Sequence, residues 1–393
     1  MISLEGLDYK GKRVFLRVDF NVPLDEKGNI RDDTRIRASL PTINYLLKKK
    51  AKLIVASHLG RPKGKSDPKL SLKPVAKRLG ELVSAEVIQA PDCIGEEVTN
   101  LKKKLKEGQI LLLENLRFHA EETANDSCFA ERLAQEVDYY VNDAFGTCHR
   151  AHASVLAITQ YVKKKAAGYL LKKEVDYLSK AIHSPQKPYV AILGGAKVSD
   201  KIPVIENLLN KADDILIGGA MAYTFFNAQG FEVGRSLVEE DKKDLALMLL
   251  EKAREKKVNF CLPQDHILAT ALDPEAKTEA VDAFPFPPEL MGVDIGPKTV
   301  NKYSEIIAKA KTIVWNGPLG VFEIEKFSQG TKKIAQAVAN SKAISIVGGG
   351  DTLAAVYKAG VSEKMTHIST GGGASLEFLA NETLPGLEAL EEK

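Results

Sequence analysis

Short apolar runs alternate with longer amphipathic, Lys- and Glu-rich stretches along the chain. The runs lie at residues 14–16, 53–55, 110–113, 139–141, 189–193, 214–217, 258–262, 312–315, 343–347 and 366–369. They lack a strict apolar–polar alternation, which is typical of strands covered on both faces. Stretches between them, such as 241–257, are long enough for helices. The pattern predicts βαβ units with parallel sheets, and therefore the α/β fold class.

The length of 393 residues predicts two domains, at roughly 100–200 residues per domain. A lysine run at 163–165 is followed by a strongly helical stretch at 170–182 and then by the segment 184–188, which contains two prolines. Prolines in that position end a helix. We therefore expect two doubly wound, Rossmann-like domains, 1–170 and 171–378, with 170–182 as the connecting helix.

The net charge of +3 is an average over two different halves. Residues 1–170 contain 29 Lys and Arg against 22 Asp and Glu, whereas residues 171–393 contain 26 against 30. The first half is therefore expected to meet an anionic partner. No apolar run approaches the roughly 18 residues of a membrane span, and the N-terminus lacks a signal-peptide pattern. The four cysteines are irregularly spaced, which predicts a soluble cytoplasmic protein without a disulfide framework.

Arginines follow the apolar runs of the first half, where the carboxyl ends of parallel strands are expected to meet. The segments are 17–21, 34–37, 57–61, 114–119 and 142–152, and each contains at least one arginine. The guanidinium group is a planar fork of donors that matches phosphate and carboxylate oxygens. Together these segments predict a pocket for a small polyanion.

Three other interpretations of this basic set stay open. A single arginine is often a plain surface charge, although recurrence at matching positions argues against that for the set. Clustered arginines also bind nucleic acid, but no aromatic stacking set and no helix-turn-helix or RRM signature accompanies them, so we expect no nucleic-acid partner. Cys148, His149 and His152 could hold a metal, although no further ligands lie at suitable spacing.

Glycines follow the apolar runs of the second half. The segments 194–197, 218–221, 316–320, 348–352 and 371–373 hold 12 of the 29 glycines. Glycine lets the backbone approach a ligand closely, and a helix N-terminus that opens with glycine offers free N–H groups to a phosphate. Tight turns are the alternative for any one pair. The two triplets, the first followed by Asp351, favour a surface for nucleotide phosphates.

Familiar nucleotide motifs are absent: the sequence has no P-loop, no complete GxGxxG after the first strand of either half, and no protein-kinase signature set. We expect Lys197 and Lys201 to lie on one face at the start of a helix and to point at the glycine-lined site. A basic pocket and a phosphate site predict phosphoryl transfer between a small anion and a nucleotide, with the domains closing to join them. A dinucleotide dehydrogenase and a non-enzymatic anion-binding protein remain as rivals.

Seven longer motifs surround these strand ends. In the first half they are 17–23, 57–62, 113–118 and 142–147, and in the second half they are 194–201, 315–318 and 348–352. In order and spacing they resemble the phosphoglycerate kinase family along essentially the whole chain. Ala220 and Cys148 stand where other small residues also occur in that family.

The resemblance implies reversible in-line phosphoryl transfer between 1,3-bisphosphoglycerate and ADP, giving 3-phosphoglycerate and ATP, with Mg²⁺ and in a monomer. It implies that the triose substrate is held by Asp19, Asn21, Arg35, His58, Arg61, Arg117 and Arg150. It implies that the nucleotide is held by Gly195, Lys201, Gly219, Gly292, Glu323, Gly349, Gly350, Asp351 and Thr352, with Glu323 at the ribose and Asp351 at Mg²⁺. The transferring phosphoryl group would be stabilised by Arg35, Lys197, Gly372 and Gly373. The tail 379–393 would pack back on the first domain.

Overall fold

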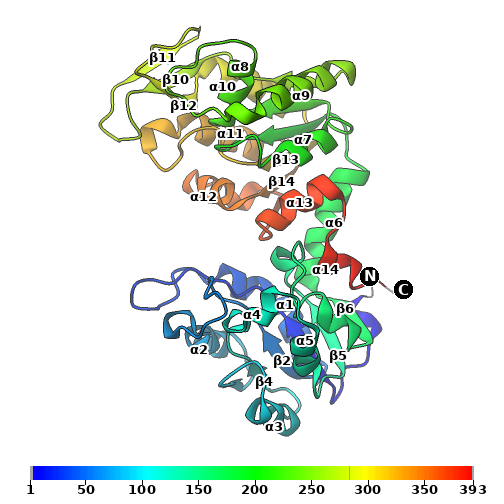
Figure 1. Ribbon diagram of the computed structural model, residues 1–393. Helices are drawn as coiled ribbons and strands as arrows, with labels where there is room; N and C mark the ends of the chain where they lie inside the picture. Colours follow the sequence, from blue (N-terminus) through cyan, green and yellow to red (C-terminus); the bar gives the residue numbers. More distant parts are fainter. Residues whose placement is uncertain (1–2, 283, 392–393) are drawn as a thin grey trace. The chain divides into compact units, whose positions relative to one another are not determined.

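The computed structural model describes residues 3–282 and 284–391. The described residues form two compact units (Figure 1). Unit 1 comprises the described residues of Met1–Asp176 and Thr383–Lys393, and unit 2 comprises those of Tyr177–Glu382. The chain passes from one unit to the other within helix α6, Tyr169–His183, which is the helix expected at 170–182. The return to unit 1 comes at residue 383, four residues later than the tail expected from residue 379.

Unit 1 is built on a six-stranded, wholly parallel sheet of order β3-β4-β2-β1-β5-β6. Its strands are β1 Arg13–Arg17, β2 Lys52–Ala56, β3 Val87–Gln89, β4 Ile110–Leu112, β5 Tyr139–Asn142 and β6 Lys164–Ala167. The four apolar runs of the first half form β1, β2, β4 and β5. Two strands carry no apolar run that predicts them: β3 is only half-buried, and β6 is an edge strand that begins with two lysines.

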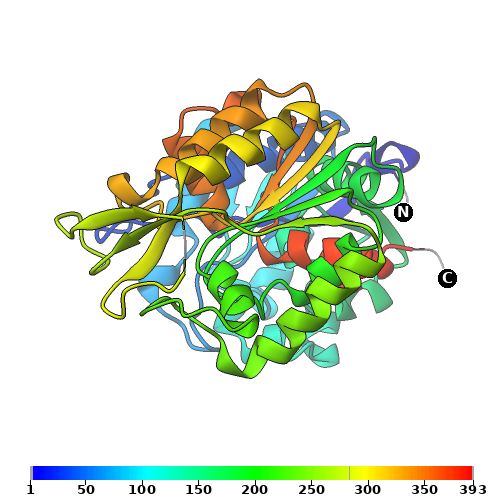
Figure 2. The same ribbon diagram turned by 90° about the horizontal axis from the view of Figure 1, so that it is seen from above.

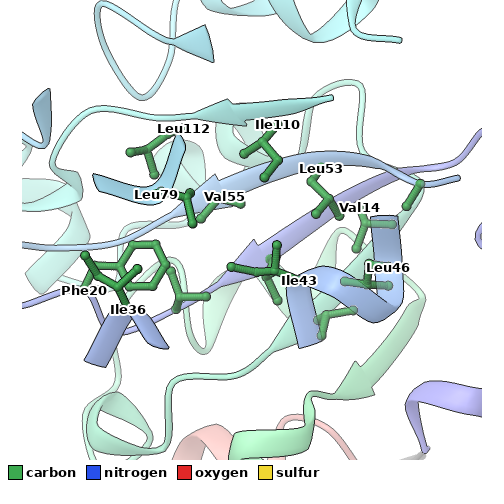
Figure 3. Packing of buried hydrophobic residues seen from close by; sticks show 14 of the residues in the cluster. Val14, Phe20, Ile36, Ile43, Leu46, Leu53, Val55, Leu79, Ile110 and Leu112 are labelled. Atoms are coloured by element: carbon green, nitrogen blue, oxygen red, sulfur yellow. The ribbon is translucent and has the colours of Figure 1, made fainter. Parts of the chain in front are cut away.

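Helices of unit 1 bury their apolar faces on this sheet. They are α1 Thr34–Lys48, α2 Lys73–Leu82, α3 Glu96–Lys104, α4 Ala120–Thr123, α5 Ser127–Ala134 and α14 Pro385–Glu388, with 3-10 turns at 4–6, 68–70, 116–118, 145–147 and 157–160. In the core, Ile43 and Leu46 of α1 pack against Val14 and Leu53 of the sheet (Figure 3). All four side chains are fully buried, and burial of each contributes about 1.5–3 kcal/mol to folding.

Unit 2 has a second six-stranded parallel sheet, of order β15-β14-β13-β7-β8-β9. Its strands are β7 Tyr189–Leu193, β8 Asp214–Ile217, β9 Asn259–Cys261, β13 Thr312–Asn316, β14 Ile344–Gly348 and β15 His367–Ile368. All six predicted runs of the second half form strands. The order reverses between β7 and β13, and this switch point is where open α/β sheets bind ligands.

A separate antiparallel sheet of order β11-β10-β12 extends unit 2. It consists of β10 His266–Ala269, β11 Thr278–Val281 and β12 Met291–Ile295. No sequence pattern predicts this sheet, because β11 is largely exposed and carries no apolar run. Strand β12 lies beside the candidate nucleotide site.

The helices of unit 2 cover both faces of its parallel sheet. They are α7 Ile202–Leu208, α8 Met221–Ala228, α9 Lys243–Glu255, α10 Pro297–Lys309, α11 Gln329–Asn340, α12 Gly350–Lys358 and α13 Gly373–Asn381, with 3-10 turns at 240–242, 325–327 and 362–364. Figure 2 shows α10 and α11 on one face and α8 and α9 on the other. The two units are thus the two α/β domains with parallel sheets that the sequence predicts. Among the described residues, no helix is long and apolar enough to cross a membrane.

Candidate active site

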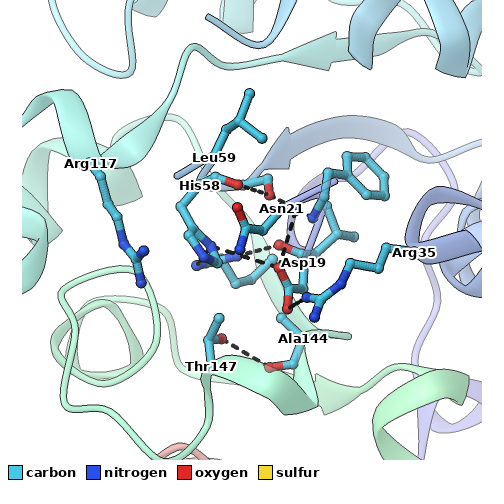
Figure 4. Close-up of polar contacts among 12 residues, drawn as sticks. Asp19, Asn21, Arg35, His58, Leu59, Arg117, Ala144 and Thr147 are labelled. Atoms are coloured by element: carbon cyan, nitrogen blue, oxygen red, sulfur yellow. Dashed lines mark hydrogen bonds and ion pairs between the residues drawn. The ribbon is translucent and has the colours of Figure 1, made fainter. Parts of the chain in front are cut away.

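The end of β1 brings a buried arginine, Arg17, and a buried carboxylate, Asp19, to the carboxyl edge of the sheet in unit 1. Figure 4 shows Asp19 between His58 and Arg35. Arg17 is the last residue of β1, and its Nη2 lies 3.4 Å from Nδ1 of His58, which follows β2. Two residues after β1, the carboxylate of Asp19 accepts a hydrogen bond from Arg35 in the first turn of α1. The other oxygen of Asp19 lies 3.9 Å from Nδ1 of His58. Two strand ends and one helix therefore meet at this carboxylate.

Two further arginines approach the same edge after β4 and β5. Arg117 donates from Nη1 to the carbonyl oxygen of Gly60 at 2.8 Å, while its buried Nε has no hydrogen-bond partner among the described residues. Arg150 donates from Nε to Nε2 of His149 at 3.0 Å. A buried N–H group without a partner costs free energy, so this Nε is a donor that the described residues leave unsatisfied.

The positive charges at this edge of the sheet lower the pKa values of two neighbouring groups. Burial and the nearby charges of Arg17 and Arg150 lower the pKa of Arg117 to about 10. Burial, together with the charges of Arg17 and Arg117, outweighs the attraction of Asp19 and lowers the pKa of His58 well below its usual value. His58 is therefore neutral at pH 7. A bound anion would relieve the repulsion between the arginines, which is the electrostatic condition for binding a phosphorylated substrate.

The structure places the remaining predicted triose residues nearby. Oδ1 of Asn21 accepts a hydrogen bond from the backbone N–H of Gly60 at 2.8 Å, which ties the loop after β1 to the loop after β2. Arg61 follows Gly60 and is exposed. Direct contacts join Asp19 to Arg35 and to His58, whereas Asn21 and Arg117 are linked through Gly60.

A buried series of hydrogen bonds, which the sequence did not predict, holds Arg17 in place behind these residues. Nε of Arg17 donates to Oγ of Ser154 at 2.8 Å, and Ser154 donates from that hydroxyl to Glu122 at 2.6 Å. The backbone N–H of Ser154 also donates to Glu122, at 2.9 Å. All three residues are 0% exposed. Nothing in the sequence could have linked them, because Glu122 in α4 and Ser154 in the loop after β5 belong to no recognisable motif.

Unit 2 contains a cavity of about 220 Å³ beyond the carboxyl ends of β7 and β13. Five of the residues expected at the nucleotide line it: Gly195, Gly219, Gly292, Glu323 and Asp351. Gly292 belongs to β12, and a Cβ atom at this position would lie 1.8 Å from the hydroxyl oxygen of Tyr223. The absence of a side chain at residue 292 is therefore required for Tyr223 to occupy the cavity wall.

Beside the cavity, the loops after β7 and β13 approach each other backbone to backbone at the switch point of the sheet. A Cβ atom on Gly194 would lie 2.1 Å from the carbonyl oxygen of Pro318, and one on Gly317 would lie 2.1 Å from that of Gly194. The loops that follow β7 and β13 are also joined by a hydrogen bond from the N–H of Gly195 to the carbonyl oxygen of Pro318, at 2.9 Å. Only glycines permit this approach, because a side chain at either position would collide with the facing carbonyl oxygen.

The two glycine triplets lie at helix N-termini, as the sequence predicts. Gly349 caps α12 with φ of +93°, and Gly350 is the first residue of that helix. Gly372 caps α13, and Gly373 is its first residue. Thr352 accepts a hydrogen bond at Oγ1 from the backbone N–H of Gly317, at 2.6 Å, which fixes α12 to the loop after β13. Both helices present free N–H groups of the kind that bind phosphate.

The prediction that Lys197 and Lys201 share one helical face is wrong. Helix α7 begins at Ile202 with Pro203 in its first turn, so Lys201 is its N-cap and Lys197 lies before it, exposed. Proline favours the first helical turn, which sets the start of the helix after both lysines. Lys201 is buried and donates from Nζ to Oδ1 of Asn316, and burial lowers its pKa to about 8.

The structure also bears on the alternative of a metal near Cys148. Its thiol lies 3.5 Å from the carbonyl oxygen of Ala144. The metal-ligating side chains that come together among the described residues are instead Asp92, Cys93 and His119. His119 is bonded to Asp92 at 2.6 Å, and Cys93 donates to the carbonyl of Glu114 at 2.9 Å, so the group braces the ends of β3 and β4.

Comparisons with known proteins support the sequence resemblance. The family model described as phosphoglycerate kinase matches residues 4–382. A protein named phosphoglycerate kinase from Koribacter versatilis is 58% identical over 400 residues, which cover 100% of this chain and 99% of that protein. A protein of the same name from Acidobacterium capsulatum is 59% identical over 401 residues, again covering 100% and 99%.

Solved structures are similar over the same extent. The structure of phosphoglycerate kinase from Coxiella burnetii has a TM-score of 0.89 and 45% identity, and the match covers 99% of this chain and 98% of that one. The structure of the phosphoglycerate kinase from Pyrococcus horikoshii has a TM-score of 0.82 and 37% identity, with the same coverage. The fold described above is therefore shared with both structures along nearly their whole length.

Proposed function

The chain belongs to the phosphoglycerate kinase family and is a phosphotransferase with a carboxyl group as acceptor, and we propose that its two units hold the two substrates separately. The reaction is reversible phosphoryl transfer between 1,3-bisphosphoglycerate and ADP, giving 3-phosphoglycerate and ATP. In this proposal the basic edge of unit 1 binds the triose, and the glycine-lined cavity of unit 2 binds the nucleotide.

The observation that carries the triose assignment is the unpaired, buried Nε of Arg117 beside Arg17 and Arg150. A phosphate or carboxylate oxygen would satisfy that donor and reduce the repulsion among the three cations. Asp19, Asn21, Arg35, His58, Arg61, Arg117 and Arg150 would form this site. His58, being neutral, would contribute a hydrogen bond rather than a charge.

The nucleotide assignment rests on the chemistry of the cavity in unit 2. The N-termini of α12 and α13 supply N–H groups for phosphates, and Lys201 supplies a buried charge. Gly195 and Gly219 line the cavity without side chains, which leaves room for the nucleotide. Glu323 lines the same cavity and would accept hydrogen bonds from the ribose hydroxyls. Gly292, Gly349, Gly350 and Thr352 would complete the wall.

Asp351 fits a role as a ligand of Mg²⁺. It is exposed, lies in the first turn of α12 and lines the cavity, so its carboxylate faces the expected position of the phosphates. Protein Mg²⁺ sites commonly use one or two carboxylates together with substrate phosphates and water. When bound there, the ion would neutralise charge on the nucleotide phosphates.

Transfer between the two sites needs no general base, because the attacking group in the ATP-consuming direction is a carboxylate that is already ionised at pH 7. Catalysis would then rest on alignment and charge stabilisation. Arg35, Lys197 and the backbone N–H groups of Gly372 and Gly373 would stabilise the phosphoryl group during in-line transfer. The units would have to close on each other for this to happen, in a monomer that works in the cytoplasm.

The assignment of the sites is tested by binding measurements on two variants. Arg117→Ala should weaken 3-phosphoglycerate binding at least tenfold and leave MgADP binding unchanged, since a charge-assisted contact is lost in unit 1 only. Lys201→Ala should show the opposite pattern. Titration calorimetry measures both, and loss of the same ligand in both variants would contradict the division.

Closure is tested separately by small-angle X-ray scattering of the wild-type chain. The radius of gyration should fall when 3-phosphoglycerate and MgADP are both present, and less so with either ligand alone. A radius that stays the same with both ligands would count against closure. The same sample, passed through size-exclusion chromatography with light scattering, checks the proposed monomer.

A further inference from the structure

We propose that Asp294 is a positioning residue for the nucleotide, because its buried carboxylate fixes the segment 320–330, which carries Glu323, to strand β12. This inference rests on the proposed binding of the nucleotide in the cavity of unit 2. Asp294 lies in β12, is 3% exposed and is among the residues that line that cavity. The resemblance assigns it no role.

Both oxygens of the Asp294 carboxylate are held by backbone N–H groups. Oδ1 accepts from Ile295 at 2.9 Å within β12, and Oδ2 accepts from Gly330 at 2.7 Å in the first turn of α11. The second bond joins the end of the segment 320–330 to the strand. Because the carboxylate is already engaged on both oxygens, we infer that it acts through this segment and not by direct contact with a ligand.

The beginning of the segment is fitted to the same carboxylate. A Cβ atom on Gly320 would lie 2.2 Å from Oδ1 of Asp294, and one on Gly330 would lie 2.5 Å from it. Glycines thus stand at both ends of the segment where it packs on Asp294. Between them, the N–H of Val321 donates to the carbonyl of Val293 at 2.9 Å, which adds a second attachment to β12.

Glu323 lies between these attachments. It lines the cavity together with Val321 and Phe322, so its position depends on where the segment is held. If one attachment is lost, Glu323 should sample positions away from the ribose, and nucleotide binding should weaken without any change to the phosphate-binding backbone. The predicted effect is therefore confined to nucleotide affinity.

Asp265 provides a matched control in the same unit. It is also buried, at 4% exposed, and it accepts hydrogen bonds from the backbone of Lys298 and Thr299 at the start of α10. A Cβ atom on Gly296 would collide with it at 2.3 Å, as the glycines do with Asp294. It differs in that the cavity lining does not include it.

The experiment compares Asp294→Asn and Asp265→Asn by MgADP titration calorimetry and by steady-state kinetics. Asparagine has one acceptor oxygen for the two N–H groups of Ile295 and Gly330, and its NH₂ group meets the other N–H, so the fit between the segment 320–330 and β12 is disturbed. We expect a rise of about tenfold in the Kd for MgADP and in the KM for MgATP, with kcat and the KM for 3-phosphoglycerate within twofold of wild type. Asp265→Asn should lower thermal stability and leave the nucleotide constants unchanged.

Three results would overturn the inference: unchanged MgADP affinity in Asp294→Asn, equal weakening in both variants, or an equal rise in the KM values of both substrates. If Asp294→Asn does not fold, Gly320→Ala tests the same contact and should weaken nucleotide binding by a similar factor. Failure of wild-type protein to bind MgADP, or normal binding in Lys201→Ala, would instead contradict the proposed nucleotide site.

Discussion

The carboxylate of Asp19 accepts a hydrogen bond from the guanidinium of Arg35, which joins the end of β1 to the first turn of α1. The side chain of Arg35 is 34% exposed, against 11% for Asp19. Asp19 therefore holds one end of the guanidinium group, while the rest of Arg35 stays accessible. A cation anchored in this way is suited to stabilise charge on a transferring group, because its position is fixed before the reaction.

Arg35→Ala should lower kcat by at least about 10²–10³-fold with a modest loss of 3-phosphoglycerate affinity, the usual scale for a group that stabilises a transition state. Arg37→Ala is the control, since Arg37 lies on the same helix and pairs with Asp33. Steady-state kinetics in the ATP-consuming direction measures both variants. Near-normal turnover in Arg35→Ala would remove Arg35 from the catalytic step.

Lys197→Ala tests a residue whose surroundings differ from the sequence prediction. Lys197 is exposed and lies in the loop before α7, so its side chain does not belong to a helical face. We expect kcat to fall by about 10²-fold, as for loss of a charge at the transferring group. Lys187→Ala, which removes another exposed lysine of unit 2, should have no effect. A rise in the KM for nucleotide with kcat unchanged would make Lys197 a binding residue.

Lys201 should give nucleotide binding a dependence on alkaline pH. Burial lowers its pKa to about 8, so the Nζ group loses its proton as the pH rises through that value. The KM for MgATP should therefore rise between pH 7 and pH 9, because a neutral amine attracts phosphate less than an ammonium does. Lys201→Arg keeps its charge over this range and should show a flatter profile. An equally steep profile in the variant would assign the titration to another group.

The sequence predicted the parts of the molecule that rest on local patterns. Apolar runs such as 189–193 form strands because these strands are buried on both faces of the sheet. The glycine triplets that end at Gly350 and Gly373 lie where helices begin. The sequence did not reveal β11, which has no apolar run. Nor did it reveal the hydrogen bonds from Arg17 through Ser154 to Glu122, which join a strand, a loop and a helix that are distant in sequence. The sequence did not indicate a role for Asp294 either, because its hydrogen-bond partner is distant in sequence. Its partner, Gly330, is recognisable only once the chain has folded.

Asp143 follows β5 and anchors the start of the helix that leaves unit 1. It is 0% exposed, and its Oδ1 accepts hydrogen bonds from the backbone of Leu170 and Leu171 at 2.9 and 3.2 Å, in the first turn of α6. A Cβ atom on Gly168 would lie 2.1 Å from that oxygen, so the turn is built around the carboxyl group. Burial raises the pKa of Asp143 to about 7, from an ordinary value of 3.8.

This raised pKa predicts how Asp143→Asn will change stability with pH. Between about pH 4 and pH 7 the folded chain keeps a proton on Asp143 that the unfolded chain has lost, so this group's contribution to stability falls as the pH rises and levels off above 7. The slope is about 1.4 kcal/mol per pH unit at most. Asparagine does not titrate, so its contribution to stability does not fall with pH. Its side-chain oxygen can still accept hydrogen bonds from the backbone N–H groups in the first turn of α6. Asp143→Asn should therefore gain stability relative to wild type from pH 5 to pH 8 in thermal melts.

Asp176→Asn is the control, because it changes an exposed residue on the same helix, and its stability relative to wild type should show no such trend. A stability difference between Asp143→Asn and wild type that stays constant with pH would show that the carboxyl group of Asp143 does not titrate in this range.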